Sequence, residues 1–453
     1  MTALWFKEAL LATGWAQGVR LTLARGRIER VETGAVPGAG DERHDVAIPG
    51  LPNLHSHAFQ RAMAGLTERR DQSQDNFWTW RELMYRFVDR LQPDDVAAIA
   101  AQAFMEMLEC GFTHVGEFHY LHNNPAGQPY AAVAEMATRV AEAAKKTGIR
   151  LTLLPVFYAH SAFGGKPPTP NQRRFMTSLD SFATLMEESR RAVAPLGDAV
   201  VGIAPHSLRA TTREELTALV PLAKGNPIHI HIAEQTKEVE DCLAATGARP
   251  VQWLLEHMPV NEHWCLVHAT HTTPEELRGI AARNAVVGLC PITEANLGDG
   301  VFDAGGFTEK GGRFGVGSDS NVLIDAPEEL RLLEYGQRLI RRQRNVLSRG
   351  SGVSTGQAIF DHALSGGAAA LSTDPAGLIA GAAADIVTFG SATLRATGLT
   401  HDRMLDYWIF AARGQMIDTV WRAGRKVVEA GRHCDRDAIE TRYARVMKKL
   451  LAT

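Results

Sequence analysis

The middle of this chain alternates short runs of β-branched and other apolar residues with longer amphipathic stretches, and this rhythm constrains the fold most. Stretches such as 94–110 and 213–223 carry apolar residues at helical spacing. Alternation of strands with helices is typical of βα units around a parallel sheet. We therefore predict an α/β fold of the (β/α)8 barrel type, with eight strands that end near Asn53, Glu117, Tyr158, Pro205, Ile232, His268, Cys290 and Gly317.

The two ends of the chain share a different texture. Segments 18–34, 383–390 and 417–433 alternate apolar and polar residues around glycine-containing turns, which predicts hairpins. Neither end has enough strands for a sheet of its own, because an isolated hairpin is marginal in water. We expect residues 1–49 and 375–453, including a C-terminal helix, to form one small β-sandwich, with the barrel of residues 50–374 inserted between them.

Composition and charge exclude several classes of protein. The net charge of −3 and the absence of a basic run argue against nucleic acid or an anionic membrane as partner. No apolar run approaches the roughly 20 residues of a membrane helix, and the N-terminal residues lack the pattern of a signal peptide. Five cysteines without a CxxC pair are typical of a reducing compartment, so we expect a cytoplasmic protein.

Histidines gather where two of the expected strands end. His55 and His57 lie two residues apart, so both imidazoles share one face of a strand. His229 and His231 alternate with isoleucines, and Glu234 follows three residues later. Neutral imidazole is the commonest metal ligand in proteins. A buried strand histidine is more often structural, however, and we expect this of one of the second pair.

Two further strand ends carry ionisable residues. His268 ends an apolar run, and Asp319 stands in a small-residue turn after another. An aspartate after Gly-Ser is by itself more often a turn residue or a cap. Together, however, histidine or carboxylate follows the first, fifth, sixth and eighth strands, at the edge where barrel enzymes build their sites. This convergence predicts a metal site.

These motifs resemble the amidohydrolase superfamily: HSH after the first strand, HIAE after the fifth, then His268 and Asp319. Members with two metals bridge their ions by a modified lysine on strand four, where this chain reads AVVGIAPHS without lysine. The resemblance is therefore to the one-metal aminohydrolases, which act on nucleobases, triazines and related amidine-like groups. Those enzymes share the PH dipeptide of strand four, here Pro205 and His206.

The resemblance implies a ligand set and a mechanism. One divalent ion is expected, most often Zn²⁺, although such sites also accept Fe²⁺ or Mn²⁺. Asp319 would take a proton from the attacking water, Glu234 would protonate the nitrogen that leaves, and His268 would orient the hydroxide or the developing oxyanion. The implied metal ligands are His55, His57, His231 and Asp319.

The loops after the strands bear on the substrate. Residues 68–86 are rich in arginine and aromatic residues, and Arg209 lies three residues beyond His206. Arginine binds carboxylates in a bidentate manner, so two arginines at the barrel mouth suggest an acidic substrate. The alternative, that each arginine pairs with a carboxylate of the protein, stays open at this point.

The segments HSHAFQRAMAGLTE, FWTWRELMY, EFHYLH and PHSLRA resemble, within that branch, the formimidoylglutamate deiminase family. This resemblance implies a small substrate with two carboxylates, N-formimino-L-glutamate, which is deaminated to N-formyl-L-glutamate and ammonia in histidine degradation. Gln60 would contact the substrate near the metal. The implied substrate-binding residues are Gln60, Arg81, Tyr120, His206, Arg209 and Ser320.

Two other functions compete with this hypothesis. A nucleobase or nucleoside deaminase, of the guanine or cytosine type, could use the same metal centre but would need a flat apolar slot. A barrel that has lost catalysis could serve as a binding protein, yet such relatives usually lack metal ligands, and all four are present here. Relatives are often dimers, so the resemblance also implies a homodimer.

Overall fold

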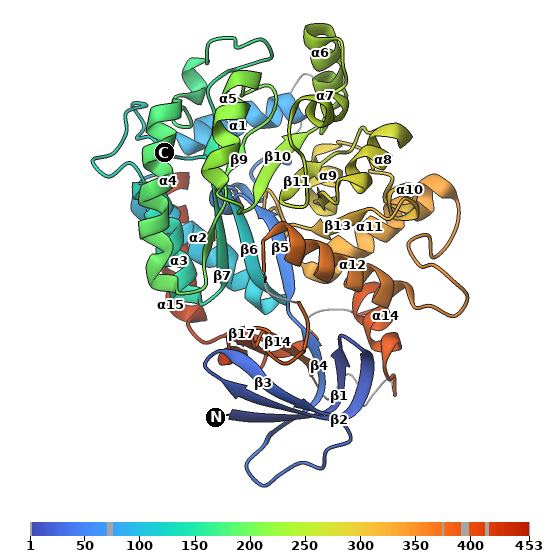
Figure 1. The fold of residues 1–453 in the computed structure, drawn as a ribbon. Helices are drawn as coiled ribbons and strands as arrows, with labels where there is room; N and C mark the ends of the chain where they lie inside the picture. Colours follow the sequence, from blue (N-terminus) through green and yellow to red (C-terminus); the bar gives the residue numbers. More distant parts are fainter. Residues whose placement is uncertain (1, 70–75, 374–375, 391–397, 413–415, 453) are drawn as a thin grey trace.

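The computed structural model describes residues 2–69, 76–373, 376–390, 398–412 and 416–452 (Figure 1). At its centre, strands pair in two parallel runs. The first run, in order of pairing, is β5 (Leu51–Ser56), β6 (Phe112–His119), β7 (Arg150–Phe157) and β8 (Val200–Val201), with β9 (Ala204–Pro205) also beside β7. The second is β10 (Ile228–Ile232), β11 (Trp264–His268), β12 (Val286–Leu289) and β13 (Arg313–Val316).

Isolated parallel bridges close these two runs into a ring. Ile203 bridges to Ile228 and Ser207 to His231, which joins the fourth strand position to the fifth. A bridge from Ser56 to Asp319 joins the first position to the eighth. The result is the predicted (β/α)8 barrel, and each strand ends within three residues of its predicted end.

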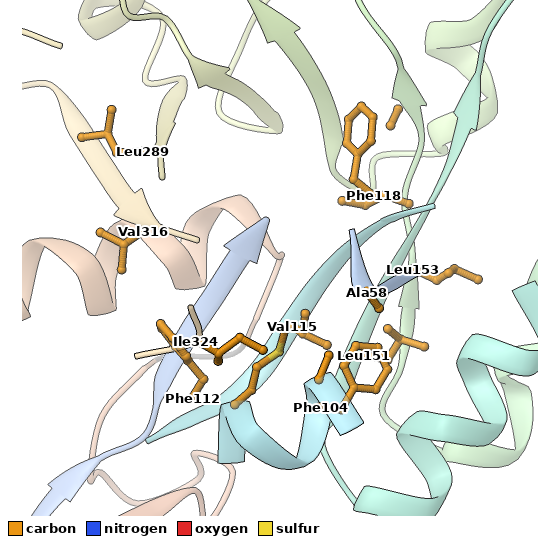
Figure 2. Packing of buried hydrophobic residues seen from close by; sticks show 14 of the residues in the cluster. Ala58, Phe104, Phe112, Val115, Phe118, Leu151, Leu153, Leu289, Val316 and Ile324 are labelled. Carbon is orange, nitrogen blue, oxygen red and sulfur yellow. The ribbon is translucent and has the colours of Figure 1, made fainter. Parts of the chain in front are cut away.

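Helices surround the ring and supply the outer layer of the core (Figure 1). Figure 2 shows Phe112 and Val115 of β6 near Leu151 and Leu153 of β7, together with Phe104 of α2. Each such buried side chain contributes about 1.5–3 kcal/mol. No helix of the described residues is long and apolar enough to cross a membrane. Besides α1, described below, the helices around the barrel are α2 (Pro93–Glu109), α3 (Glu135–Thr147), α4 (Leu179–Val193), α5 (Arg213–Leu219), α6 (Thr236–Thr246), α7 (Pro250–His257), α8 (Pro274–Ala282), α9 (Pro291–Leu297), α10 (Ala304–Glu309), α11 (Ala326–Arg341) and α12 (Thr355–Ala370).

The segment between β5 and α2, whose residues 68–86 are expected in a loop, contains helical structure. It includes the 3-10 helix η1 (Ala58–Met63) and the α-helix α1 (Phe77–Val88). Asn76 caps α1, because its side chain accepts the backbone N–H of Trp78 at 2.9 Å. Helix α1 lies at the mouth of the barrel, where it lines the pocket described below. Shorter 3-10 turns are η2 (Pro170–Gln172), η3 (Ala194–Leu196) and η4 (Val220–Ala223).

Both ends of the chain join in one eight-stranded sheet below the barrel, as predicted (Figure 1). The two layers expected of a sandwich take the form of one continuous sheet, in which only β1 and β4 pair in parallel. The backbone N–H of Ile28 in β3 donates to the carbonyl of Ala382 at 2.9 Å. The edge of the sheet at β3 therefore folds back, and the sheet encloses a hydrophobic core separate from that of the barrel. Its order is β17 (Arg432–His433), β16 (Arg425–Glu429), β15 (Ile417–Arg422), β14 (Ile386–Phe389), β4 (Glu42–Pro49), β1 (Thr2–Leu11), β2 (Gly14–Ala24) and β3 (Arg27–Glu32).

Two helices connect this sheet with the barrel. Helix α14 (Asp402–Phe410) packs against α12, and α15 (Arg436–Leu451) packs along α2. Lys449 of α15 forms an ion pair with the buried Asp95 at the start of α2, with an Nζ–Oδ2 distance of 2.7 Å. The C-terminal helix therefore lies on the outer surface of the barrel.

Candidate metal centre and substrate pocket

Four predicted ligands converge at the carboxyl end of the barrel strands. The Nε2 atoms of His55 and His231 lie 3.0 Å apart. Asp319 Oδ1 lies 3.5 Å from His55 Nε2 and 3.3 Å from His57 Nε2. Ligands at about 2.0–2.1 Å from one ion, at angles of about 90–110°, stand roughly 2.9–3.4 Å from each other. The donor atoms therefore match one divalent cation.

The protonation of these groups favours a cation. Burial lowers the pKa of His55 to about 4 and that of His57 to about 3, so both imidazoles are neutral at pH 7. Burial opposes the ionisation of Asp319, but the surrounding imidazoles of His55 and His57 hold the pKa of this carboxyl below its usual range. His57 Nδ1–H donates to the carbonyl of Phe118 at 2.9 Å, which leaves Nε2 free to bind the ion.

The neighbouring His229 points elsewhere. Its Nε2 bonds to the carbonyl of Ala370, at the end of α12, at 2.9 Å. His229 and His231 lie two residues apart and therefore share one face of β10, so they differ in depth: His231 stands nearer the carboxyl end of the strand, where the site lies, and His229 lies two residues before it. Of the histidine pair on β10, His231 therefore faces the centre and His229 anchors the strand to α12.

Three strand ends at the centre have strained backbone. His268, Asp319 and Ala233 have φ values of 68°, 44° and 51°, in the left-handed region that non-glycine residues rarely adopt. Such conformations cost about 1–3 kcal/mol each and cluster at functional sites. At Asp319 the geometry is held by β5, because Asp319 N–H donates to the carbonyl of His55 at 2.9 Å and His57 N–H donates to that of Asp319 at 2.8 Å.

His268 stands between two carboxylates at the centre. Its Nε2 lies 3.8 Å from Glu234 Oε1 and 3.8 Å from Asp319 Oδ2. Its Nδ1 lies 3.2 Å from Oε1 of Glu294, which also accepts the backbone N–H of Cys290 at 2.9 Å. Burial alone would lower the pKa of His268, but the charges of Glu234, Glu294 and Asp319 raise it to about 10. Burial raises the pKa of Glu234.

A pocket lined by aromatic and polar side chains opens above these groups. All predicted substrate-binding residues line it, beside His57, His231, Glu234, His268 and Asp319, and His55 is buried behind them. The sequence did not identify further lining residues, mostly aromatic, from α1 and from the segments after the third and seventh strands. These are Phe77, Trp80, Met84, Tyr85, Tyr158, Phe175, Thr293 and Leu297.

Two guanidinium groups face this pocket, and neither forms a hydrogen bond with a carboxylate of the described residues. Within the described residues Arg81 forms no ion pair, and its buried Nε has no hydrogen-bond acceptor. The nearest carboxylate oxygen to Arg209 is Oε1 of Glu238, 3.9 Å from Nε, and neither atom has a hydrogen bond. In the described part of the chain, Arg81 therefore does not pair with a protein carboxylate, and the pairing of Arg209 with Glu238 is a long contact without a hydrogen bond.

The sequence profile of the Amidohydrolase family matches residues 46–427. This chain belongs to the amidohydrolase family. A second profile, described as formimidoylglutamate deiminase HutF, N-terminal domain, matches residues 1–45. Within the family, a formimidoylglutamate deiminase of Pseudomonas aeruginosa is 45% identical over 455 residues, covering 100% of both chains.

Solved amidohydrolase structures share the whole architecture. An amidohydrolase from Brucella melitensis is 50% identical with a TM-score of 0.96, and the match covers 100% of both chains. An adenosine deaminase from Xanthomonas campestris, solved with bound zinc, is 21% identical with a TM-score of 0.84 over 100% of this chain and 99% of that one. The second likeness shows the shared fold.

The remaining pocket residues of this amidohydrolase form neutral hydrogen-bonding groups. Gln60 Nε2 donates to the hydroxyl of Tyr120 at 2.6 Å, and the buried Oε1 of Gln60 has no partner among the described residues. The hydroxyls of Ser320 and Thr293 lie 2.9 Å apart. Burial, reinforced by the charge of Arg209, holds the pKa of His206 well below its usual range, so this imidazole is neutral.

Glu294 and Glu238 are the functional candidates that the sequence did not single out. Glu294 fixes the orientation of His268, and Glu238 accepts the backbone N–H of Glu234 at 3.1 Å while facing Arg209. Both stand in helices that directly follow site strands, α9 and α6. An acid in the first turn of such a helix was the available signal.

Proposed function

We propose that this amidohydrolase hydrolyses N-formimino-L-glutamate to N-formyl-L-glutamate and ammonia in histidine degradation. The observation that carries the proposal is that Arg81 and Arg209, which form no hydrogen bond with a carboxylate of the described residues, lie in the pocket that holds the candidate metal ligands. The substrate has two carboxylates and one amidine-like group, which matches two guanidinium groups beside a deaminase centre. The 45% identical relative, named for this reaction, supports the proposal.

His55, His57, His231 and Asp319 would hold one divalent ion, and three imidazoles with one carboxylate suit Zn²⁺, with Fe²⁺ or Mn²⁺ as substitutes. When bound, such an ion supplies an activated water at neutral pH. Asp319 would accept the proton that the attacking water loses, at Oδ2, the oxygen that faces His268. His268 would donate from Nε2 to the developing oxyanion, because the surrounding carboxylates keep its ring protonated.

Glu234 would complete the proton transfer. Water adds to the formimino carbon, and its two protons would pass through Asp319 and Glu234 to the terminal nitrogen. The bond to that nitrogen then breaks as the carbonyl forms, and the nitrogen leaves as ammonia. A carboxyl whose pKa is raised by burial can hold this proton near neutral pH and release it to the nitrogen. Glu238 would fix the backbone of Glu234 for this role through its bond to the N–H group.

The substrate carboxylates would lie against the arginines. Arg81 and Arg209 offer planar forks that fit carboxylates in a bidentate manner. The neutral His206 and the hydroxyls of Tyr120 and Ser320 would donate further hydrogen bonds to the substrate. The free Oε1 of Gln60 would accept an N–H from the formimino group.

Ammonia release tests the proposal, with N-formimino-L-glutamate, N-formimino-L-aspartate, guanine and cytosine as substrates. We expect rapid turnover of the glutamate compound alone, and a KM at least about 100-fold higher in Arg81→Met, since a charged hydrogen bond pair is lost. Arg139→Met is the control, because Arg139 pairs with Glu135 on the surface of α3. Turnover of a nucleobase without the glutamate compound would instead establish the nucleobase deaminase.

A homodimer, a cytoplasmic location and the split of the chain at residues 49/50 and 374/375 are parts of the same proposal. Residues 374–375 lie outside the described residues, and α15 packs on the barrel. Light scattering of the purified protein tests the dimer. Separate expression of residues 50–374 tests whether the barrel folds without the terminal sheet.

A further inference from the structure

Trp78 stands behind the pocket, against both of its arginines. The Cζ atom of Arg81 lies 4.6 Å from the centroid of the Trp78 ring, and that of Arg209 lies 5.6 Å from it. Arg81 follows Trp78 by three residues on α1, so the two share one face of the helix. Arg209 comes from the loop after β9. One indole therefore contacts guanidinium groups from two separate elements.

A second aromatic ring completes the support of Arg81. Tyr85 lies four residues further along α1, and its ring centroid is 5.6 Å from the Arg81 Cζ atom. Arg81 is thus flanked along the helix by Trp78 and Tyr85. Trp78 does not line the pocket itself, whereas both arginines do.

Aromatic support has a particular consequence for a binding site. A carboxylate beside an arginine would occupy its N–H donors. An aromatic face attracts the cation instead and leaves the N–H donors, which lie in the plane of the guanidinium group, free. It also offsets the repulsion between two like charges that share a small pocket. The unpartnered Nε atoms of Arg81 and Arg209 agree with donors held ready for a ligand.

We infer that Trp78 is a positioning residue that determines specificity: it holds Arg81 and Arg209 beside each other so that one ligand with two carboxylates engages both. This inference rests on the proposed function for its substrate. Its ligand class, a short dicarboxylate, follows from the two guanidinium groups alone. Without the indole, the side chains of both arginines would no longer be held in place, and the affinity for dicarboxylates would fall more than that for monocarboxylates.

The test compares Trp78→Leu, Trp78→Phe and Phe87→Leu. Phe87 lies on the same helix but packs against the core and contacts neither arginine, so its variant controls for the stability of α1. Binding of glutarate and of butyrate to the metal-loaded protein is measured by calorimetry, and kcat and KM are measured with N-formimino-L-glutamate. Metal content and the midpoint of thermal unfolding show that each variant is folded.

For Trp78→Leu we expect glutarate affinity to fall about tenfold or more, since two cation–π contacts are lost, with butyrate affinity changed less than threefold. KM should rise in parallel at nearly constant kcat, and Trp78→Phe should recover most of the loss. Equal weakening of both acids, a fall in kcat alone, or a loss matched by Phe87→Leu would overturn the inference. Glutarate binding that depends on Trp78 in a protein inactive on N-formimino-L-glutamate would keep the inference and refute the proposed function. Absence of glutarate binding by an unaltered protein that turns over N-formimino-L-glutamate would refute the inference and leave the proposed function standing.

Discussion

Gly317 offers a sharp test of how the barrel holds its candidate metal ligands. It follows β13 and packs against β5, and its N–H donates to the carbonyl of Leu289 at 2.9 Å. A Cβ atom added there would lie 2.7 Å from the carbonyl oxygen, 2.8 Å from the nitrogen and 2.9 Å from the Cβ of His55. Gly317→Ala would therefore force β13 away from the strand that carries His55.

The size of the effect follows from these distances. Ordinary contacts begin near 3.4 Å, so the two strands must separate by about half an ångström or more. Overpacking of this kind costs about 1–3 kcal/mol. Metal geometry tolerates only about 0.2 Å, so the displaced His55 should raise the zinc dissociation constant about 10- to 100-fold.

Competition with a chromophoric chelator measures zinc affinity, and thermal unfolding of the zinc-free protein measures the steric cost by itself. Gly40→Ala is the matched control, because Gly40 is exposed and a Cβ there would meet no atom within 4 Å. We expect Gly40→Ala to match the unaltered protein in both assays. Wild-type zinc affinity in Gly317→Ala would refute the reasoning that this close approach fixes His55.

Three other predictions concern the centre and the core. Glu234→Gln should lower kcat about 10²- to 10⁴-fold at unchanged zinc content, measured by steady-state ammonia release and elemental analysis, because Glu234 moves protons but does not bind the ion. Removal of the ion by dipicolinate should lower the midpoint of thermal unfolding, and added zinc should restore it. A ligand that binds only the folded state adds about 4 kcal/mol to the free energy of unfolding when its free concentration is 1,000 times its dissociation constant. Burial lowers the pKa of His122 from 6.5 to about 4. The neutral side chain therefore contributes about 3 kcal/mol to the free energy of unfolding relative to the protonated form. This contribution is complete above pH 6.5 and disappears as the pH falls towards 4. His122→Gln should show a shallower fall of the unfolding midpoint over that range, and an unchanged slope would contradict the assignment.

The barrel and the convergence of its candidate ligands could be predicted because their signals are local. A strand places residues i and i+2 on one face, so His55 and His57 had to point together. Parallel strands end at one edge, so His231 and Asp319 had to lie near them. Neither inference needs any knowledge of how distant segments pack.

The terminal sheet and α1 show where local signals end. Whether β14 pairs with β4 or stacks upon it depends on contacts between segments more than 300 residues apart, which no periodicity encodes. The polar and aromatic content of residues 68–86 predicts a loop, whereas residues Phe77–Val88 form the helix α1. Asn76 and Thr79 nevertheless form a capping box, a helix signal that the sequence contains.

The contacts of Glu294, Glu238 and Trp78 were beyond sequence for a further reason. Each acts by touching a side chain from another element: His268 from β11, or Arg209 from the loop after β9. Such contacts depend on the rotation of each helix about its axis and on its tilt against the barrel. Sequence could identify the guanidinium groups, but not the ring that supports them.

The proposed chemistry and the proposed specificity of this amidohydrolase thus lie on separate elements. The candidate ligands end strands of the barrel, a frame that it shares at a TM-score of 0.84 with an adenosine deaminase only 21% identical to it. The two guanidinium groups stand instead on α1 and on the loop after β9, outside the ring of strands. Changes at Arg81 or Trp78 can therefore alter which substrate binds while the ligand geometry at His55 and Asp319 stays fixed. This separation predicts that Trp78→Leu and Arg81→Met retain full zinc content and lose affinity for dicarboxylates, and loss of zinc in either variant would show that α1 also supports the metal centre.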